Sequence, residues 1–342
     1  MPRFSVIAPT YNKAAELDCT LMGFTRQTFK DFEVVIVNDG GDDETERVVN
    51  KYDSMLNIQY TKQPNLGRSS ARNHGLKLAQ GNYIIHIDSD RLPDENFVKA
   101  HMDALSSREK TVVIGSKHCV LRKYTNSLKI FDSVKKGYMD LLVRNKKNVE
   151  GILKEEQELL TADTLRDNFH EAIRRCYLFE GPDNFPEVRK VFTDKLENFH
   201  FGWVLATTGN MSYQRLDEQL VDENFNGWGG EDTDLAFQFY LKGYSFVFNP
   251  EAINYHQEHP RERELQNELF ANARYMYEKY SMDDKTSLLI MLWLRTFAHS
   301  SKITLSEANA IYENYIKISD TALAQDYIAY AKHHAASLFN LR

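Results

Sequence analysis

The stretch "NYIIHIDSD", residues 82–90, decides the fold prediction, because a short apolar run here ends in two aspartates. A continuous apolar run of this kind is typical of a strand that is covered on both faces of a sheet. Four further short apolar runs occur in the first third of the chain: 3–9, 32–38, 57–61 and 111–116. Segments with helical spacing separate these runs: 14–28, 43–53, 68–79 and 94–106. Strands that alternate with helices predict βαβ units, and therefore an α/β fold around a mostly parallel sheet.

The composition of the 342-residue chain is that of an ordinary globular protein, with 42% hydrophobic and 27% charged residues. The formal net charge of −7 argues against a protein that binds the phosphate backbone of a nucleic acid. The cysteines, Cys19, Cys119 and Cys176, are odd in number, widely spaced and without a C-x-x-C pair. They fit neither a disulfide framework nor a zinc ribbon, so we expect a reducing compartment.

No targeting or membrane signal is evident in the sequence. The chain starts "MPRFSVIAPT", which lacks the basic region and long apolar segment of a signal peptide. The most apolar later stretch, "SLLIMLWL" at 287–294, is far shorter than the ~20 residues of a membrane-spanning helix. We therefore expect a cytoplasmic protein without a transmembrane segment, and peripheral attachment at the inner membrane face is the alternative.

After residue 116 the sequence pattern changes several times along the chain, and these changes indicate how the chain is divided into parts. After residue 116, lysine and arginine become frequent and a helical pattern covers 153–179, before a strand-like run near 203–207. Helical patterns return from about 264, and these helices could pair with a second copy of the chain. We therefore predict a main domain at 1–260 with a helical insert, followed by a helical C-terminal extension. The predicted parts are, in order, 1–116, 117–200 (the insert), 201–260 and 261–342 (the extension).

Asp88 and Asp90 follow the strand of the opening stretch at positions i and i+2. In an extended chain their side chains point the same way, and two close carboxylates repel each other unless a cation lies beside them. A hard divalent ion held by one or two carboxylates keeps coordination positions open for the phosphate oxygens of a ligand. The pair therefore indicates a metal site at the carboxyl edge of the sheet, where ligands bind in such folds. A polar strand-to-loop turn is the alternative.

Two further motifs follow predicted strands. In "VNDGGDD", the Asp39 carboxylate could accept hydrogen bonds from a base or a sugar hydroxyl, although for this motif alone an Asp-Gly turn that caps the next helix is the favoured interpretation. In "NLGRSSARNHG", Arg68 and Arg72 lie near a helix start, and both helix N-termini and arginines suit phosphate or a nucleotide. The alternative is a solvated basic helix. Neither a P-loop nor a G-x-G-x-x-G motif is present.

His256 lies in "INYHQEHP", just after a strand–turn–strand stretch with Pro250 at its bend. An imidazole would bias a mixed oxygen site away from magnesium and towards a softer ion such as manganese. A structural histidine is the alternative interpretation.

In "GWGGEDTD", 227–234, three glycines and a tryptophan precede three acids that open an amphipathic helix, with Gly243 as its natural end. Acids at a helix N-terminus stabilise it through the helix dipole, so Glu231 and Asp232 have a structural explanation. That explanation does not account for "GWGG", because glycine-rich backbone costs conformational entropy. An aromatic side chain beside carboxylates, Trp228 here, suits a sugar ring.

In order, these motifs resemble those of the nucleotide-sugar glycosyltransferases of family 2, which have a GT-A fold. The likeness is strongest to the subgroup that shares its C-terminal half with bacterial chondroitin polymerases, β-1,4-galactosyltransferases and polypeptide GalNAc transferases. "SVIAPTYN", "VIVNDGGDD", "GRSSARNHG" and "YIIHIDSD" resemble the donor half, while "TTGNMSY", "FNGWGGEDTDLAFQFYLKGYSF" and "AINYHQEHP" resemble the acceptor half. The resemblance covers about 1–120 and 203–260.

The resemblance implies a set of donor-binding residues. Those at 9–11 would border the uracil, Asp39 would hydrogen-bond the base, and Asp88 would contact the ribose. The full implied donor set is Pro9, Thr10, Tyr11, Asp39, Arg68, Arg72, Asp88 and Ser89.

The resemblance also implies a metal site and an acceptor site. Asp90 and His256 would bind manganese, with magnesium as the alternative ion. Trp228 and Glu231 would bind the acceptor sugar, and Asp232 would be the general base. The retaining relatives carry "GGEN", so an aspartate after Glu231 argues for inversion.

We therefore predict a metal-dependent inverting transferase that moves a hexose or N-acetylhexosamine from a UDP-sugar to a glycan, glycolipid or peptide acceptor. A glycoside hydrolase that uses two of these carboxylates is one alternative, and a non-catalytic sugar- or nucleotide-binding subunit of the same fold is another. In "QEHPRERE", Arg261 and Arg263 could form a lid over a diphosphate or a charged linker. The base-rich stretch 122–154 could face an anionic acceptor or be a solvated surface.

Overall fold

The computed structural model of the chain describes residues 2–42, 44–124, 137, 140–141, 157–181, 184–218, 221–259, 266–281, 283–297 and 302–339. The two arginines of the lid hypothesis, Arg261 and Arg263, and most of the base-rich stretch 122–154 lie outside these residues.

The N-terminal half of the central sheet is parallel. Its order is β3-β2-β1-β4, and the predicted strands of this region are present with ends shifted by a few residues. Thr10 pairs with Asn38, so β1 and β2 end together and place their following loops side by side. The strands are β1 (Phe4–Thr10), β2 (Phe32–Asp39), β3 (Ile58–Gln63) and β4 (Tyr83–Ile87).

The other half of the sheet is mixed. β10 lies antiparallel between β4 and β6, β6 and β11 are parallel, and β5 and β9 pair antiparallel with β11 and β6. The predicted α/β class is therefore confirmed, with antiparallel strands joined to the parallel core. These strands are β5 (Arg91–Pro93), β6 (Thr111–Leu121), β9 (Tyr177–Glu180), β10 (Asn210–Gln214) and β11 (Ser245–Glu258). β7 (Lys123–Tyr124) and β8 (Gln157–Glu158) form a separate small ladder.

Helices cover both faces of the sheet. Val6 and Ile7 belong to two different hydrophobic clusters, because successive side chains of a strand point to opposite faces. One cluster contains side chains from α1 (Ala14–Thr25), α2 (Thr45–Asn50), α4 (Phe97–Leu105) and α7 (Ala162–Cys176). The other cluster contains side chains from α3 (Arg68–Leu78), α8 (Pro186–Phe192), α9 (Gly202–Leu205) and α10 (Glu231–Leu241).

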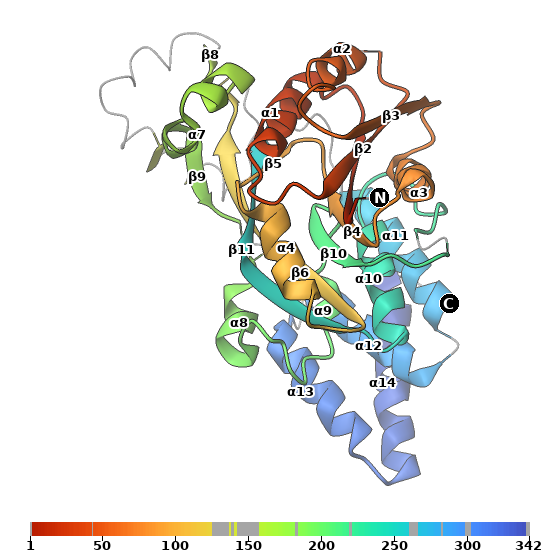
Figure 1. The fold of residues 1–342 in the computed structure, drawn as a ribbon. Coiled ribbons are helices and arrows are strands. Elements are labelled where there is room, and N and C mark those ends of the chain that lie inside the picture. The colour runs from red at the N-terminus through yellow and green to blue at the C-terminus, as the bar shows by residue number, and fades with distance from the viewer. Residues whose placement is uncertain are drawn as a thin grey trace.

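The C-terminal helices share this second core with the sheet domain. Trp293 packs edge-on against Trp203 of α9 with ring centroids 5.6 Å apart. In Figure 1 the last two of these helices lie at the end of the molecule opposite α1 and α2. Within the described residues, no helix combines the length and hydropathy needed to cross a bilayer. The helices are α11 (Gln266–Tyr280), α12 (Asp284–Arg295), α13 (Leu305–Ile316) and α14 (Thr321–Phe339).

Two local predictions are wrong, and a third is confirmed only in part. The strand expected near 203–207 is the short helix α9, whose Trp203 and Leu205 are completely buried, so its apolar run reflects burial and not strand periodicity. The predicted strand–turn–strand around Pro250 is one strand, β11, with a register shift between Asn249 and Ile253, and His256 lies inside it. In the helical pattern at 153–179, the described part forms β8, α7 and β9.

Candidate active site

The carboxyl ends of β1 and β2 bring the first group of predicted residues together. Thr10 is buried at the end of β1, and its Oγ1 has no hydrogen-bond partner among the described residues. Tyr11 follows and is 49% exposed. Asp39 is buried, and its carboxylate accepts hydrogen bonds from the backbone N–H groups of Leu66 (3.0 Å) and Gly67 (2.9 Å). Asp39 therefore fixes the loop that leads into α3.

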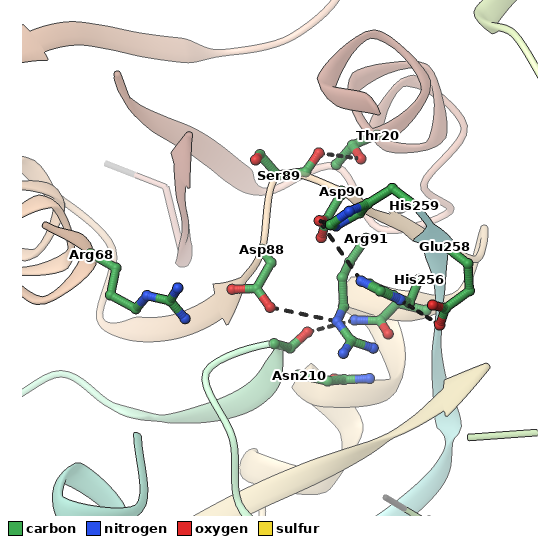
Figure 2. A network of polar contacts seen from close by, with 12 residues as sticks. Thr20, Arg68, Asp88, Ser89, Asp90, Arg91, Asn210, His256, Glu258 and His259 are labelled. Carbon is green, nitrogen blue, oxygen red and sulfur yellow. Dashed lines mark hydrogen bonds and ion pairs between the residues drawn. The ribbon is translucent and has the colours of Figure 1, made fainter. Parts of the chain in front are cut away.

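Asp88 and Asp90 are adjacent to the same strand end but have different partners. The chain turns after β4, with Arg91 N–H donating to the Asp88 carbonyl at 3.0 Å, so the two carboxylates do not point the same way as an extended chain would require. Figure 2 shows Asp88 on the side of Arg91 and Asp90 on the side of the histidines. Ser89 between them is buried, and its carbonyl accepts a hydrogen bond of 2.9 Å from Thr20 Oγ1.

Asp90 lies in a cluster with two histidines. Its Oδ2 is 3.3 Å from His259 Nε2 and 3.8 Å from His256 Nε2, and the three side chains converge in Figure 2. Burial acts to raise the pKa of Asp90, but the neighbouring His256 and His259 outweigh it and hold the pKa below its usual range. His256 Nδ1 is 2.7 Å from Glu258 Oε1. A carboxylate that accepts from one ring nitrogen fixes the tautomer and leaves the other nitrogen free to ligate.

Potential ligand atoms of Asp90, His256 and His259 all lie within 4.8 Å of one another. One carboxylate and two imidazoles form a donor set that fits a divalent transition metal better than magnesium. The structure therefore brings together the two predicted metal residues and adds His259.

Arg72 is buried between two carboxylates. Its Nη2 donates to Asp88 Oδ1 at 3.1 Å and its Nη1 donates to Glu231 Oε1 at 3.2 Å. Arg68, one turn earlier in α3, is more exposed and places Nη1 3.5 Å from the same Glu231 oxygen. Arg72 therefore connects Asp88, which follows β4, to Glu231 in the first turn of α10.

Glu231 and Asp232 open α10 at the middle of the candidate site. Glu231 is 3% exposed, and its Oε2 has no hydrogen-bond partner among the described residues. Asp232 is half-buried, and its Oδ1 accepts a hydrogen bond of 2.8 Å from Thr233 N–H. Burial, and then the charge of Glu231, raise the pKa of Asp232 to about 6, although Arg72 and Lys117 act in the opposite direction. A carboxyl group with a pKa near neutrality suits a general base.

Trp228 is half-buried in the loop before α10, and its backbone N–H donates to Glu268 Oε2 of α11 at 2.7 Å. Gly229 and Gly230 both have positive φ, +87° and +95°, a conformation that side chains rarely adopt. Asp234, the third acid, is fully buried and bonded to Lys279 and Tyr280, so its role is structural.

Sequence reasoning missed His259, Glu258 and Lys117. The two histidines are separated by only two residues in "HQEH", and this spacing is the signal that could have identified His259 and its neighbour Glu258. Lys117 carried no sequence signal, because nothing near it in the chain indicates that it is buried close enough to Asp232 to affect its pKa.

Comparison with known proteins identifies a family for the N-terminal part of the chain. Residues 5–148 match the family model that is described as "Glycosyl transferase family 2". The chain is 29% identical over 262 residues to chondroitin synthase of Escherichia coli, covering 75% of this chain and 35% of that protein. Residues 5–148 therefore form a glycosyltransferase family 2 domain. The uncharacterized glycosyltransferase YfnE of Bacillus subtilis is also 29% identical, over 287 residues, which are 81% of this chain and 70% of YfnE.

A solved structure supports the fold of the chain. TarS residues 1–349 of S. aureus, in complex with UDP-GlcNAc, superpose with a TM-score of 0.56 at 18% identity, covering 99% of this chain and 89% of that chain. The likeness confirms the predicted GT-A fold with its C-terminal helices. The chain spans only about a third of the length of the E. coli chondroitin synthase, 35%.

Proposed function

We propose that the chain is a metal-dependent, inverting glycosyltransferase that moves a hexose or N-acetylhexosamine from a UDP-sugar to an acceptor hydroxyl. The observation that carries the proposal is the position of Asp232. Asp232 lies next to Glu231 in the chain, and Arg72 bonds both Glu231 and Asp88. A carboxyl group whose pKa is raised to about 6 is therefore adjacent to the predicted donor-binding residues. The complex of the similar TarS with UDP-GlcNAc supports a UDP-sugar donor.

A divalent cation would be held by Asp90, His256 and His259, because their ligand atoms lie within 4.8 Å of one another. Manganese would be preferred to magnesium, because two of the ligands are imidazoles. When bound, the cation would supply positive charge that stabilises the negative charge on the departing diphosphate. Arg68, exposed at the N-terminus of α3, would add charge on the same ligand. Pro9, Thr10, Tyr11 and Ser89 would line the nucleotide, as the resemblance implies.

Asp39 would orient the base through the loop that it fixes at Leu66 and Gly67. In the acceptor half, Trp228 would stack on a sugar ring, and the unpartnered Oε2 of Glu231 would accept a hydrogen bond from a sugar hydroxyl. A buried acceptor atom without a donor costs about 1–3 kcal/mol, so a hydroxyl that supplies the donor binds with a gain of that order.

In the transfer step, Asp232 takes the proton of the attacking hydroxyl. The hydroxyl oxygen forms a bond to the anomeric carbon while the bond from that carbon to the diphosphate oxygen breaks, and UDP leaves with the electron pair. Attack from the face opposite the leaving group inverts the anomeric centre, so an α-linked donor yields a β-linked product. General base catalysis of this kind contributes roughly 10²–10⁴-fold.

The test is a panel of UDP-sugars with glycoside acceptors, read out as UDP release with added manganese and with a chelator. We expect one donor to dominate, chelation to abolish release and NMR of the product to show a β-linkage. Release that is unaffected by chelation overturns the metal assignment, and an α-linked product overturns inversion. The absence of UDP release from every donor overturns the transferase itself. The acceptor class, the cytoplasmic location and pairing of chains through the C-terminal helices stay predictions.

A further inference from the structure

We infer that α11 of the C-terminal extension is part of the acceptor site, with Asn272 and Glu268 as positioning residues of the loop that carries Trp228. The inference deepens the proposed function and rests on it. Nothing in the sequence pattern linked the extension to the site, because the motifs end at about residue 260.

Asn272 is 4% exposed and directs its side-chain amide at the loop backbone. Its Nδ2 donates to the carbonyls of Asn226 at 2.9 Å and Gly229 at 2.7 Å, on either side of Trp228. One buried amide therefore satisfies two carbonyls of a glycine-rich loop that has no secondary structure of its own. Without this amide the two carbonyls would lose their partner, and other loop conformations would become as favourable.

Glu268 lies one turn before Asn272 in α11 and binds a backbone N–H group of the same loop. Its Oε2 accepts the backbone N–H of Trp228 at 2.7 Å. A Cβ added at Gly229 would lie 2.9 Å from Leu269, and one at Gly230 would lie 3.1 Å from the Asn272 Cβ. The glycines therefore allow the loop backbone to approach α11 closely. This close approach is needed whether or not Trp228 contacts a sugar.

The attachment continues on both sides of the loop. Lys279 Nζ bonds Asp222 at 2.7 Å before the loop and Asp234 at 2.9 Å after it, and Tyr280 Oη donates to Asp234 at 2.7 Å. Asp234 lies two residues after Asp232 in the first turn of α10, so α11 fixes the start of the helix that presents the general base. The extension thereby orients both the sugar platform and the base.

The chain offers a direct optical readout of this loop. Its three tryptophans are Trp203, Trp228 and Trp293, and Trp203 and Trp293 are 0% and 3% exposed. Acrylamide quenching of the intrinsic fluorescence therefore reports mainly on Trp228, and Trp228→Phe identifies its share of the signal.

The test compares Asn272→Ala and Glu268→Ala with two controls. Asn309→Ala removes an equally buried asparagine of α13 that bonds the backbone of Asn198 and His200, away from the loop. Glu268→Gln keeps an oxygen that can accept from Trp228 N–H. Each variant is measured for acrylamide quenching and for UDP release from the preferred UDP-sugar, in water alone and with p-nitrophenyl glycosides as acceptor probes.

We expect both alanine variants to raise the quenching of Trp228 and to raise the KM for the acceptor probe about 5-fold or more, the scale of one or two lost hydrogen bonds. The KM for the UDP-sugar should change by less than about 2-fold, because the donor half keeps its contacts. Asn309→Ala and Glu268→Gln should behave as wild type in both measurements.

Unchanged quenching, or raised quenching with an unchanged probe KM, overturns the inference. An equal effect of Asn309→Ala also overturns it, because the loss would then reflect general loosening of the helices. If no variant and no wild-type sample releases UDP from any donor, the proposed function fails, and the quenching data alone decide whether α11 holds the loop.

Discussion

Arg72 donates a hydrogen bond of 3.2 Å to Glu231, which lies 159 residues later in the chain. The same guanidinium bonds Asp88, so one buried cation joins the motif after β4 to the first turn of α10. The sequence predicted both residues as ligand contacts, whereas in the structure they contact each other. The two halves of the site are thereby held together before any ligand binds.

Removal of this cation should destabilise the protein strongly. Arg72→Ala leaves the Glu231 carboxylate buried with only the more distant Arg68, and breaking a buried pair in this way costs about 3–5 kcal/mol of unfolding free energy. Urea unfolding measures the loss. Arg274→Ala is the matched control, because Arg274 pairs with Glu278 on an exposed helix face and should contribute little. Equal stability of the two variants would contradict the structural role of Arg72.

Asp232→Asn should lower kcat by roughly 10²–10⁴-fold while the unfolding free energy stays close to that of the wild type. Asparagine has nearly the same shape and can still accept from Thr233 N–H, but it cannot take a proton. Steady-state UDP release at saturating donor, with a thermal melt of each protein, checks both parts. Turnover within a few-fold of wild type would remove Asp232 as the base.

The pH profile of kcat/KM should fall on the acid side with an apparent pKa of about 6. Burial and the charge of Glu231 raise the pKa of Asp232 to about 6, so below that pH the carboxyl is protonated and cannot act as a base. The rate should then drop about tenfold for each pH unit. Glu231→Gln removes the like charge and should move the acid limb to lower pH. An acid limb that stays in place in Asp232→Asn would assign it to another group.

Replacement of the metal-site histidines should weaken manganese binding. His256→Ala and His259→Ala each remove an imidazole from the cluster around Asp90, and Glu258→Gln disturbs the bond that orients His256, a change that typically costs about 10–100-fold in affinity. Electron paramagnetic resonance of free manganese gives the dissociation constants without an activity assay. His170→Ala changes an exposed histidine next to Glu95 and should bind as wild type. Unaltered binding in His259→Ala would exclude that residue from the site.

Gly230→Ala should destabilise the protein more than Gly243→Ala. Both glycines have positive φ, +95° and +77°, so alanine is strained at either position. At Gly230 the added methyl group would also lie 3.1 Å from Asn272 and Phe225, whereas at Gly243 none of the described residues beyond its chain neighbours lies within 4 Å. Overpacking of this kind costs about 1–3 kcal/mol, which urea unfolding of the two variants should show as their difference. Equal losses would mean that the loop is not packed against α11 as the structure has it.

Much of the fold was predictable, because the first strands are continuous apolar runs with turn residues at their ends. "VVIV" lies within β2 and "YIIHI" forms β4. Strands that are covered on both faces of a sheet need apolar side chains on each face, which makes such runs recognisable. The same reasoning failed at 203–207, where an apolar run is buried in the short helix α9. Short apolar runs do not distinguish a buried strand from a buried helix.

For the individual site residues, the sequence predicted candidate chemistry but not the contacts between them. Asp90 and His256 lie close together, and the "HQEH" spacing already contained His259. The different partners of Asp88 and Asp90 were not predictable, because they depend on the turn of the backbone after β4, which the residue types alone do not reveal.

The sequence by itself determined the alternation of strands and helices, and it determined which residue types stand at the carboxyl ends of the strands. Both follow from local periodicity and from the chemistry of side chains close together in the chain. Only the tertiary structure decided that Arg72 neutralises Asp88 and Glu231, and that Asn272 and Glu268 hold the loop of Trp228. The physical reason is that packing sets burial and brings together hydrogen-bond partners that are 16 to 159 residues apart, which no local pattern records.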